Sequence, residues 1–211
     1  MHVPDGFLAP QLTLPAYAVS APLWAWAARR HFGPASVESL PVVGSLTALA
    51  FVVQTILIPV PGGTSIHLVG VTLLAILQGP LAAFVCESLV LLVQALFFGV
   101  GGITVLGVNA LAMGLLGPLV GWLAWKAVRP LSERAALFLA GWASTQVASL
   151  AVAGVLALQH RLDPGYFPVP PAVTLAAMLV PSLAVAGVVE GLYTVLALSL
   201  LRRARLRGVE A

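Results

Sequence analysis

Long apolar stretches alternate along the chain with short breaks that contain charged residues, glycine or proline. About 20 apolar residues in a helix cross the hydrocarbon core of a bilayer, which is roughly 30 Å thick. The pattern therefore predicts membrane-spanning helices, and the candidates lie over residues 12–28, 41–58, 67–78, 81–98, 106–125, 135–158 and 172–201. The third candidate is short and fits a half-buried helix that starts inside the bundle. The predicted fold class is an all-α integral membrane protein with seven transmembrane helices.

The composition supports this interpretation and excludes two other classes of protein. Hydrophobic residues make up 60% of the 211 positions and charged residues only 8%, whereas a soluble domain carries about 25% charged residues. So few charges cannot cover the surface of a soluble enzyme, and disordered chains are poor in apolar residues. We expect one membrane domain over residues 1–211, with an N-terminal arm at 1–11, a helical bundle at 12–201 and a basic cytoplasmic tail at 202–211.

The basic residues predict the orientation of the chain in the membrane, because cytoplasmic loops carry an excess of lysine and arginine. With seven spans, only Arg161 falls on the outer side. The other basic residues share the opposite side: Arg29, Arg30, Lys126, Arg129, Arg134, Arg202, Arg203, Arg205 and Arg207. We therefore expect the N-terminus outside and the C-terminus in the cytoplasm of a multi-pass protein of the cell (inner) membrane. The net charge of +3 reflects this topology, and we expect no nucleic-acid partner.

The sequence lacks the motifs of several kinds of enzyme. It has no Gly-x-x-x-x-Gly-Lys-Ser/Thr, so this chain does not hydrolyse ATP through a P-loop, and it has no His-Glu-x-x-His. It also has no Gly-x-Ser-x-Gly nucleophile elbow. Its acidic residues include no close pair suited to general acid–base catalysis. We expect neither enzymatic activity nor an organic cofactor.

The first two residues, Met1 and His2, form a candidate metal chelator. The amine of Met1 and the amide nitrogen of His2 close a five-membered ring on a metal, and the same amide nitrogen and Nδ1 of His2 close a six-membered ring. One further imidazole completes a square of four nitrogens, the geometry that Ni(II) and Cu(II) prefer. The alternative is an exposed tail histidine, which is the common outcome for an arbitrary Met-His start.

His67 is the candidate for the fourth nitrogen. It follows a turn-forming Pro-Gly-Gly-Thr-Ser-Ile stretch on the predicted outer side. Residues 2–11 extend up to about 30 Å, which lets the arm fold back into the bundle and bring His2 to His67. A histidine at membrane depth is costly unless it is paired or liganded; the alternative is a core histidine bonded to a neighbouring carbonyl. His31 and His160 each lie beside arginine, and we expect both to be solvated.

Other polar residues are candidates for supporting roles. A ligating imidazole usually donates its second N–H to an acceptor, and the acceptor candidates from the same outer region are Asp5, Thr64, Ser65 and Asn109. The alternative for Thr64 and Ser65 is capping of the third span. Glu87 and Glu190 fall within spans, where a bare carboxylate is expensive. They are expected to form hydrogen bonds between helices or to contact a partner subunit.

Five segments together resemble the NikM/CbiM family. They are Met-His-Val-Pro-Asp-Gly-Phe-Leu at 1–8, Pro-Gly-Gly-Thr-Ser-Ile-His-Leu-Val-Gly at 61–70, Gln-Ala-Leu-Phe-Phe-Gly at 94–99, Leu-Gly-Val-Asn-Ala at 106–110 and Gly-Pro-Leu-Val-Gly at 117–121. Members of this family are the nickel- or cobalt-binding S components of energy-coupling-factor (ECF) transporters. The motifs cover residues 1 to about 121, and the number of spans and the loop charges extend the likeness to the end of the chain.

The resemblance implies a seven-helix protein that binds the metal through Met1, His2 and His67. It also implies a transmembrane coupling (T) subunit, cytoplasmic ATPase subunits and a small accessory membrane subunit as partners, which fits the missing P-loop. The Pro-Asp after His2 and the Pro-Gly-Gly-Thr-Ser before His67 look more like nickel-type members. Ni(II) is therefore the expected transported ligand.

Three alternatives stay open at this point. The first is a Co(II)-binding S component of the CbiM type. The second is an autonomous metal channel or secondary transporter, which needs ionisable residues along a path through several spans. The third is a membrane-embedded metalloenzyme, which needs an open metal position and a nearby base.

Overall fold

The computed structural model of the chain describes residues 2–32, 40–55, 58–60 and 64–209, and of residues 58–60, 64–66 and 204–209 only the backbone. The helices are α1 (Pro10–His31), α2 (Leu40–Gln54), α3 (Val71–Gln78), α4 (Pro80–Phe98), α5 (Leu106–Asn109), α6 (Gly117–Val128), α7 (Glu133–Leu162), α8 (Pro171–Pro181) and α9 (Gly187–Val209). Two π-helical segments, η2 (Ala110–Leu116) and η3 (Ser182–Ala186), join α5 to α6 and α8 to α9.

The helical architecture of a membrane protein is confirmed. Four helices in the described part are long and apolar enough to cross a bilayer: Pro80–Phe98, Leu106–Val128, Glu133–Leu162 and Pro171–Arg203. Each of the seven predicted spans coincides with a helical segment. The third is an eight-residue helix, α3, whose first five residues are all buried. Helix α3 therefore starts inside the bundle, as the short length of the third predicted span indicated.

The region between α2 and α3 differs from the prediction. The second span was expected to continue to residue 58, but α2 ends at Gln54, and strands β1 (Ile58–Val60) and β2 (Thr64–Ile66) form an antiparallel hairpin that pairs Pro59 with Ser65. The residue that precedes a proline is disfavoured in the α conformation and favoured in the extended one. Pro59 therefore opposes a helix that continues to Ile58, which lies in β1.

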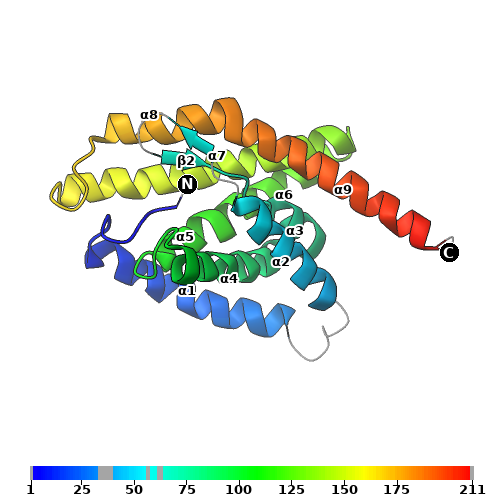
Figure 1. Cartoon of the computed structure of the whole chain (residues 1–211), viewed down its shortest axis with the longest axis horizontal. Helices are drawn as coiled ribbons and strands as arrows, with labels where there is room; N and C mark the ends of the chain where they lie inside the picture. Colours follow the sequence, from blue (N-terminus) through cyan, green and yellow to red (C-terminus); the bar gives the residue numbers. More distant parts are fainter. Residues whose placement is uncertain (1, 33–39, 56–57, 61–63, 210–211) are drawn as a thin grey trace.

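The α8–α9 helix and α7 lie along one side of the molecule, and α1 lies along the other, with α4 and the α5–α6 helix between them (Figure 1). Helix α7 packs against α6, α8 and α9. Glycine allows two of these approaches: a Cβ on Gly121 of α6 would lie 2.7 Å from the Ala140 carbonyl oxygen of α7, and a Cβ on Gly191 of α9 would lie 2.7 Å from the Phe138 carbonyl oxygen. Small residues let helix backbones approach closely in lipid.

Candidate metal site

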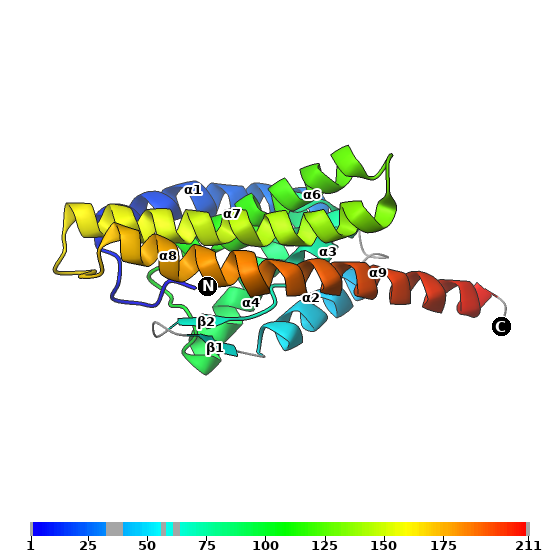
Figure 2. The same cartoon turned by 90° about the horizontal axis from the view of Figure 1, so that it is seen from above.

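The N-terminal arm, described from His2 to Ala9, folds back into the bundle (Figures 1 and 2). Val3 is fully buried. Its backbone N–H donates to Oδ1 of Asn109 at 2.9 Å, and its carbonyl accepts from Nδ2 of Asn109 at 3.0 Å. At the other end of the arm, the Ala9 N–H donates to Oε1 of Gln159 at 2.8 Å. The arm is therefore fixed at both ends by buried amide side chains.

Asp5 fixes the middle of the arm to the loop that follows α4. One carboxylate oxygen accepts from the Ile103 N–H at 3.0 Å, and the other accepts from the Thr104 N–H at 3.0 Å and from the Thr104 hydroxyl. A Cβ on Gly102 would lie 2.1 Å from the Asp5 carboxylate. Gly101 has φ +76°. A Cβ at this position would lie 3.5 Å from the Cβ of His2. The approach of Asp5 therefore requires glycine at position 102, whereas at position 101 it is the positive φ that favours glycine.

The arm brings His2 against His67. The two imidazole rings stack with their centroids 4.7 Å apart and their planes 10° from parallel. His67 is only 4% exposed. Nε2 of His2 is buried and has no hydrogen-bond partner among the described residues, which costs free energy. Two imidazoles from distant parts of the chain are thus in contact inside the bundle.

The hydrogen bond of His67 fixes its tautomer. Nδ1 lies 2.9 Å from the Leu68 carbonyl oxygen, and a carbonyl can only accept, so Nδ1 carries the proton and Nε2 carries the lone pair. Burial lowers the pKa of His67 to about 3. Burial, followed by the neighbouring His67, lowers the pKa of His2 well below its ordinary value. Both imidazoles are therefore neutral near pH 7, which is the form that binds metals.

The other predicted site residues are Met1, Asp5, Thr64, Ser65 and Asn109. Met1 lies outside the described residues, and so do the side chains of Thr64 and Ser65, whose backbone forms β2 just before His67. Asp5 accepts from two backbone N–H groups and the Thr104 hydroxyl of the loop, and Asn109 binds the backbone of Val3 in the arm. Nδ1 of His67 lies against the carbonyl of Leu68, and the supporting roles expected of Asp5 and Asn109 stay predictions.

The other histidines take no part in this site. His160 was expected to be solvated, but its Nδ1 lies 2.9 Å from the Phe167 carbonyl oxygen and the residue is half-buried. His31 ends α1. Within the described ranges, no group of three or more His, Cys, Asp or Glu side chains is placed to hold a metal ion. A donor set larger than the two imidazoles must therefore include groups other than the described side chains of these four types.

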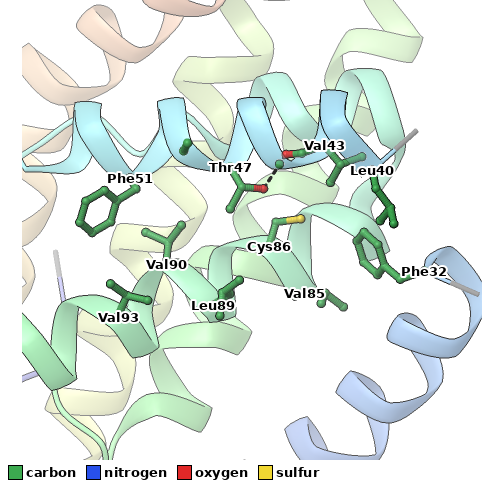
Figure 3. A pocket seen from close by; sticks show the side chains of 12 residues that line it. Phe32, Leu40, Val43, Thr47, Phe51, Val85, Cys86, Leu89, Val90 and Val93 are labelled. Atoms are coloured by element: carbon green, nitrogen blue, oxygen red, sulfur yellow. Dashed lines mark hydrogen bonds between the residues drawn. The ribbon is translucent and has the colours of Figure 1, made fainter. Parts of the chain in front are cut away.

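An open groove lies between α2 and α4 (Figure 3). It has a volume of about 500 Å³ and is lined by apolar side chains such as Phe51, Leu89 and Val93. The hydroxyl of Thr47 donates to the Val43 carbonyl of its own helix at 2.8 Å. Among the described lining residues none is charged, and Cys86 is the single residue of a type that commonly binds metals, so these residues do not form a set of donors for a cation.

The sequence did not single out Gly101 and Gly102, which leave room for the arm, or Gln159, which binds its Ala9 N–H. The two glycines gave a detectable signal, because adjacent glycines often mark a close approach of backbone to another group. Gln159 gave none, because a single glutamine in an apolar helix is compatible with many roles.

The long apolar helices and the buried arm define a multi-pass protein of the cell membrane. The model of the CbiM family, described as "Cobalt uptake substrate-specific transmembrane region", matches residues 2–207. The chain belongs to this family.

Relatives and a solved structure agree with this assignment. A protein of Methanocaldococcus jannaschii whose name assigns it to metal transport is 35% identical over 207 residues, which cover 97% of this chain and 93% of that protein. The fused nickel transport protein NikMN of Rhodobacter capsulatus is 35% identical over 92% of this chain, which spans 59% of its length. A crystal structure of a truncated transition metal transporter is 34% identical, with a TM-score of 0.91 over 97% of this chain and 99% of that one.

Proposed function

We propose that this chain is the substrate-specific S component of an ECF-type importer and that it captures Ni(II) from outside the cell. The observation that carries the proposal is the buried contact between His2 and His67, two neutral imidazoles brought together by an arm that is fixed along its length. The family description and the names of the relatives supply the context of cobalt and nickel uptake.

The proposed ligands are the Met1 amine, the His2 amide nitrogen and Nδ1, and Nε2 of His67. The assignment of Nε2 follows from the hydrogen bond that occupies Nδ1 of His67. The proposal requires that the mature chain begins at Met1 with an unmodified amine. A set of four nitrogens favours Ni(II) or Cu(II) by geometry, and among the metals named for the family and its relatives it favours nickel over cobalt. A Co(II)-binding S component remains the second candidate, because the family description names cobalt.

The distribution of basic residues supports an arrangement with the metal site toward the outside. The end of α1, the α6–α7 connection and the end of α9 lie at one end of the bundle, and the start of α1 and the α7–α8 connection lie at the other (Figure 1). An ion pair of 2.9 Å between Arg202 and Glu133 joins α9 to α7 at the basic end. By the positive-inside rule the basic end is cytoplasmic. We therefore propose seven crossings, an outer N-terminus and a cytoplasmic C-terminus.

Partners would supply the energy for uptake, because the chain has no P-loop. We propose a transmembrane coupling subunit and cytoplasmic ATPase subunits in this role, with a small accessory membrane subunit as a further candidate. An autonomous channel or secondary transporter is the competing class. Uptake of nickel by proteoliposomes that contain this chain alone, without ATPase subunits, would support that class and contradict ours.

Isothermal titration of the purified full chain with Ni(II), Co(II) and Cu(II) tests the proposal. The native start, verified by mass spectrometry, is compared with a variant that carries extra residues before Met1, and a C-terminal tag is the matched control. We expect one tight Ni(II) site in the native and C-terminally tagged forms and loss of binding in the extended form, because its first amine becomes an amide. Full nickel affinity in the extended form would overturn the ligand set, and no binding to the native form would overturn the function.

A further inference from the structure

The backbone that links His67 to α3 is held by a buried carboxylate from α9. The Val69 N–H donates to Oε2 of Glu190 at 2.8 Å, and the Gly70 N–H donates to Oε1 at 2.9 Å. Glu190 is 1% exposed. Both oxygens of one side chain therefore bind two successive amides that lie two and three residues after His67.

A second buried side chain holds the same segment from α2. Nε2 of Gln54 donates to the Val69 carbonyl at 2.8 Å and to Oε2 of Glu87, on α4, at 2.8 Å. Gln54 is 1% exposed. Both backbone groups of Val69 are thus engaged by side chains, one from α9 and one from α2, and Gln54 is itself oriented by α4.

Steric contacts leave this segment little room to move. Gly70 has φ +71°, and a Cβ at this position would lie 2.9 Å from Cγ2 of Val53 in α2. His67 and Val69 are both buried, and Nδ1 of His67 forms a hydrogen bond with the carbonyl of Leu68. The direction of that carbonyl depends on the peptide that joins Leu68 to Val69. The groups that fix Val69 therefore also fix the ring of His67.

We propose that Glu190 and Gln54 are positioning residues for metal capture, which orient His67 through the backbone of residues 68–70. The inference rests on the proposed function and adds residues to it that touch neither the metal nor its nitrogens. Groups that orient a ligating histidine typically change metal affinity 10- to 100-fold when they are mutated. The competing explanation is that Glu190 only caps the start of α3, since free amides at a helix N-terminus need acceptors. If Glu190 orients His67, its replacement changes the affinity and the spectrum of the bound nickel; if it only caps α3, both stay unchanged.

Glu190→Gln in the full chain separates them. The amide keeps the size of the side chain, but its single oxygen accepts from only one of the two N–H groups, and its NH₂ faces the other. We expect Ni(II) affinity by isothermal titration to fall about 10- to 100-fold, together with a changed visible absorption and circular dichroism spectrum of the bound nickel. Unchanged affinity and spectrum would overturn the inference.

Gln146→Leu is the matched control. Gln146 donates from Nε2 to the Ser182 carbonyl at 3.1 Å, and its Oε1 accepts from the Ser182 hydroxyl at 3.0 Å, so it also holds the chain shortly before α9 by two bonds. We expect a lower melting temperature with unchanged nickel affinity and spectrum. An equal loss of affinity in this variant would show a general packing effect and would overturn the inference.

A double-mutant cycle with His67→Ala tests whether Glu190 acts through His67. The Met1 and His2 nitrogens of the proposed set remain in His67→Ala and leave a weaker affinity to measure. In that background we expect Glu190→Gln to have no further effect, because the ring it orients is gone; additive losses would overturn the inference. If Glu190→Gln does not give folded protein, Gln54→Met replaces it in the double-mutant cycle with His67→Ala. Failure of the native chain to bind nickel would instead overturn the proposed function.

Discussion

Val3 and Asn109 form a closed pair of hydrogen bonds, in which the side-chain amide of Asn109 binds both the N–H and the carbonyl of Val3. Val3 is fully buried and Asn109 is 1% exposed. The pair works like one rung of a β-ladder between the arm and α5. Because Val3 follows His2 directly, it sets where the imidazole of His2 enters the bundle.

Replacing Asn109 by leucine should release the arm. Both hydrogen bonds to Val3 are lost, and burial of the unpaired backbone groups costs about 1–3 kcal/mol for each group. We expect the arm to leave the bundle for part of the time and the Ni(II) affinity to fall. Titration measures the affinity, and hydrogen exchange of residues 2–9 measures the release of the arm.

Asn109→Asp is the companion variant for this experiment. Its carboxylate still accepts from the Val3 N–H but faces the Val3 carbonyl without a hydrogen to donate, and a buried unpaired charge is costly, so we expect a loss at least as large as in the leucine variant. Wild-type affinity and wild-type protection of the arm in Asn109→Leu would show that the pair does not hold His2 in place.

Metal affinity should fall as the pH falls, and the imidazoles should not be the main cause. Burial lowers the pKa of both imidazoles, so proton release from the rings contributes less than it would for an exposed histidine. By contrast, the Met1 amine, with an ordinary pKa of about 7.7–8.0, and the His2 amide nitrogen must each lose a proton to act as the proposed ligands. Below the pKa of the amine, the apparent affinity should therefore change by about two decades for each pH unit.

Titrations at several pH values in buffers of different ionisation enthalpy measure the number of protons released. His67→Ala is the control, since its residual affinity should have the same dependence on pH. Nickel affinity that is constant from pH 6 to 8 would argue that the amine and the amide are not ligands.

The hydrophobic pattern was sufficient to locate the helices, because a bilayer requires long apolar segments. Helix α4, for example, was expected at 81–98 and runs over Pro80–Phe98. The hairpin was not predicted, since strands of three residues are too short to produce an alternating pattern. The π-helical segments were not predicted either, because they depend on packing between helices rather than on local residue type.

Part of the candidate site was also predictable. The reach of the arm and the cost of a histidine at membrane depth pointed to His2 and His67, and their rings are in contact; their role as ligands stays a prediction. Most partners of Asp5 and both partners of Glu190 could not be predicted, because they are backbone N–H groups. Every residue except proline carries such a group, so the sequence does not indicate which one a distant carboxylate will bind.

Gly121→Ala should destabilise the bundle. The added Cβ would lie 2.7 Å from the Ala140 carbonyl oxygen and 3.0 Å from Cβ of Ser144, so α6 and α7 must separate. Such overpacking typically costs about 1–3 kcal/mol. Thermal unfolding in detergent, followed by tryptophan fluorescence, should show a lower melting temperature.

Gly44→Ala is the matched control, because Gly44 is also within a helix and a Cβ there meets nothing within 4 Å. Gly44 lines the open groove between α2 and α4. Alanine is favoured over glycine in a helix by roughly 0.5–1 kcal/mol, so we expect an unchanged or slightly higher melting temperature. A loss of stability in Gly44→Ala equal to that of Gly121→Ala would mean that contact with α7 is not the reason for glycine at position 121.

Nickel should stabilise the chain against heat, and the effect should depend on His2. Free nickel at 100 times its dissociation constant adds about 2.7 kcal/mol to the stability of a protein that binds it only when folded. For a chain of this length that corresponds to a rise in melting temperature of about 5–10 °C. A chelator should reverse the rise, and His2→Ala should abolish most of it.

His160→Ala is the control for removal of a histidine elsewhere, since His160 contacts Phe167 and not the arm residue His2. Its melting temperature should rise with nickel as in the wild type, because the stabilising free energy comes from the donors at His2 and His67. If His2→Ala kept the full nickel-dependent rise while His160→Ala lost it, the metal would bind at the α7–α8 end of the molecule, and the stacked pair of imidazoles would need another explanation.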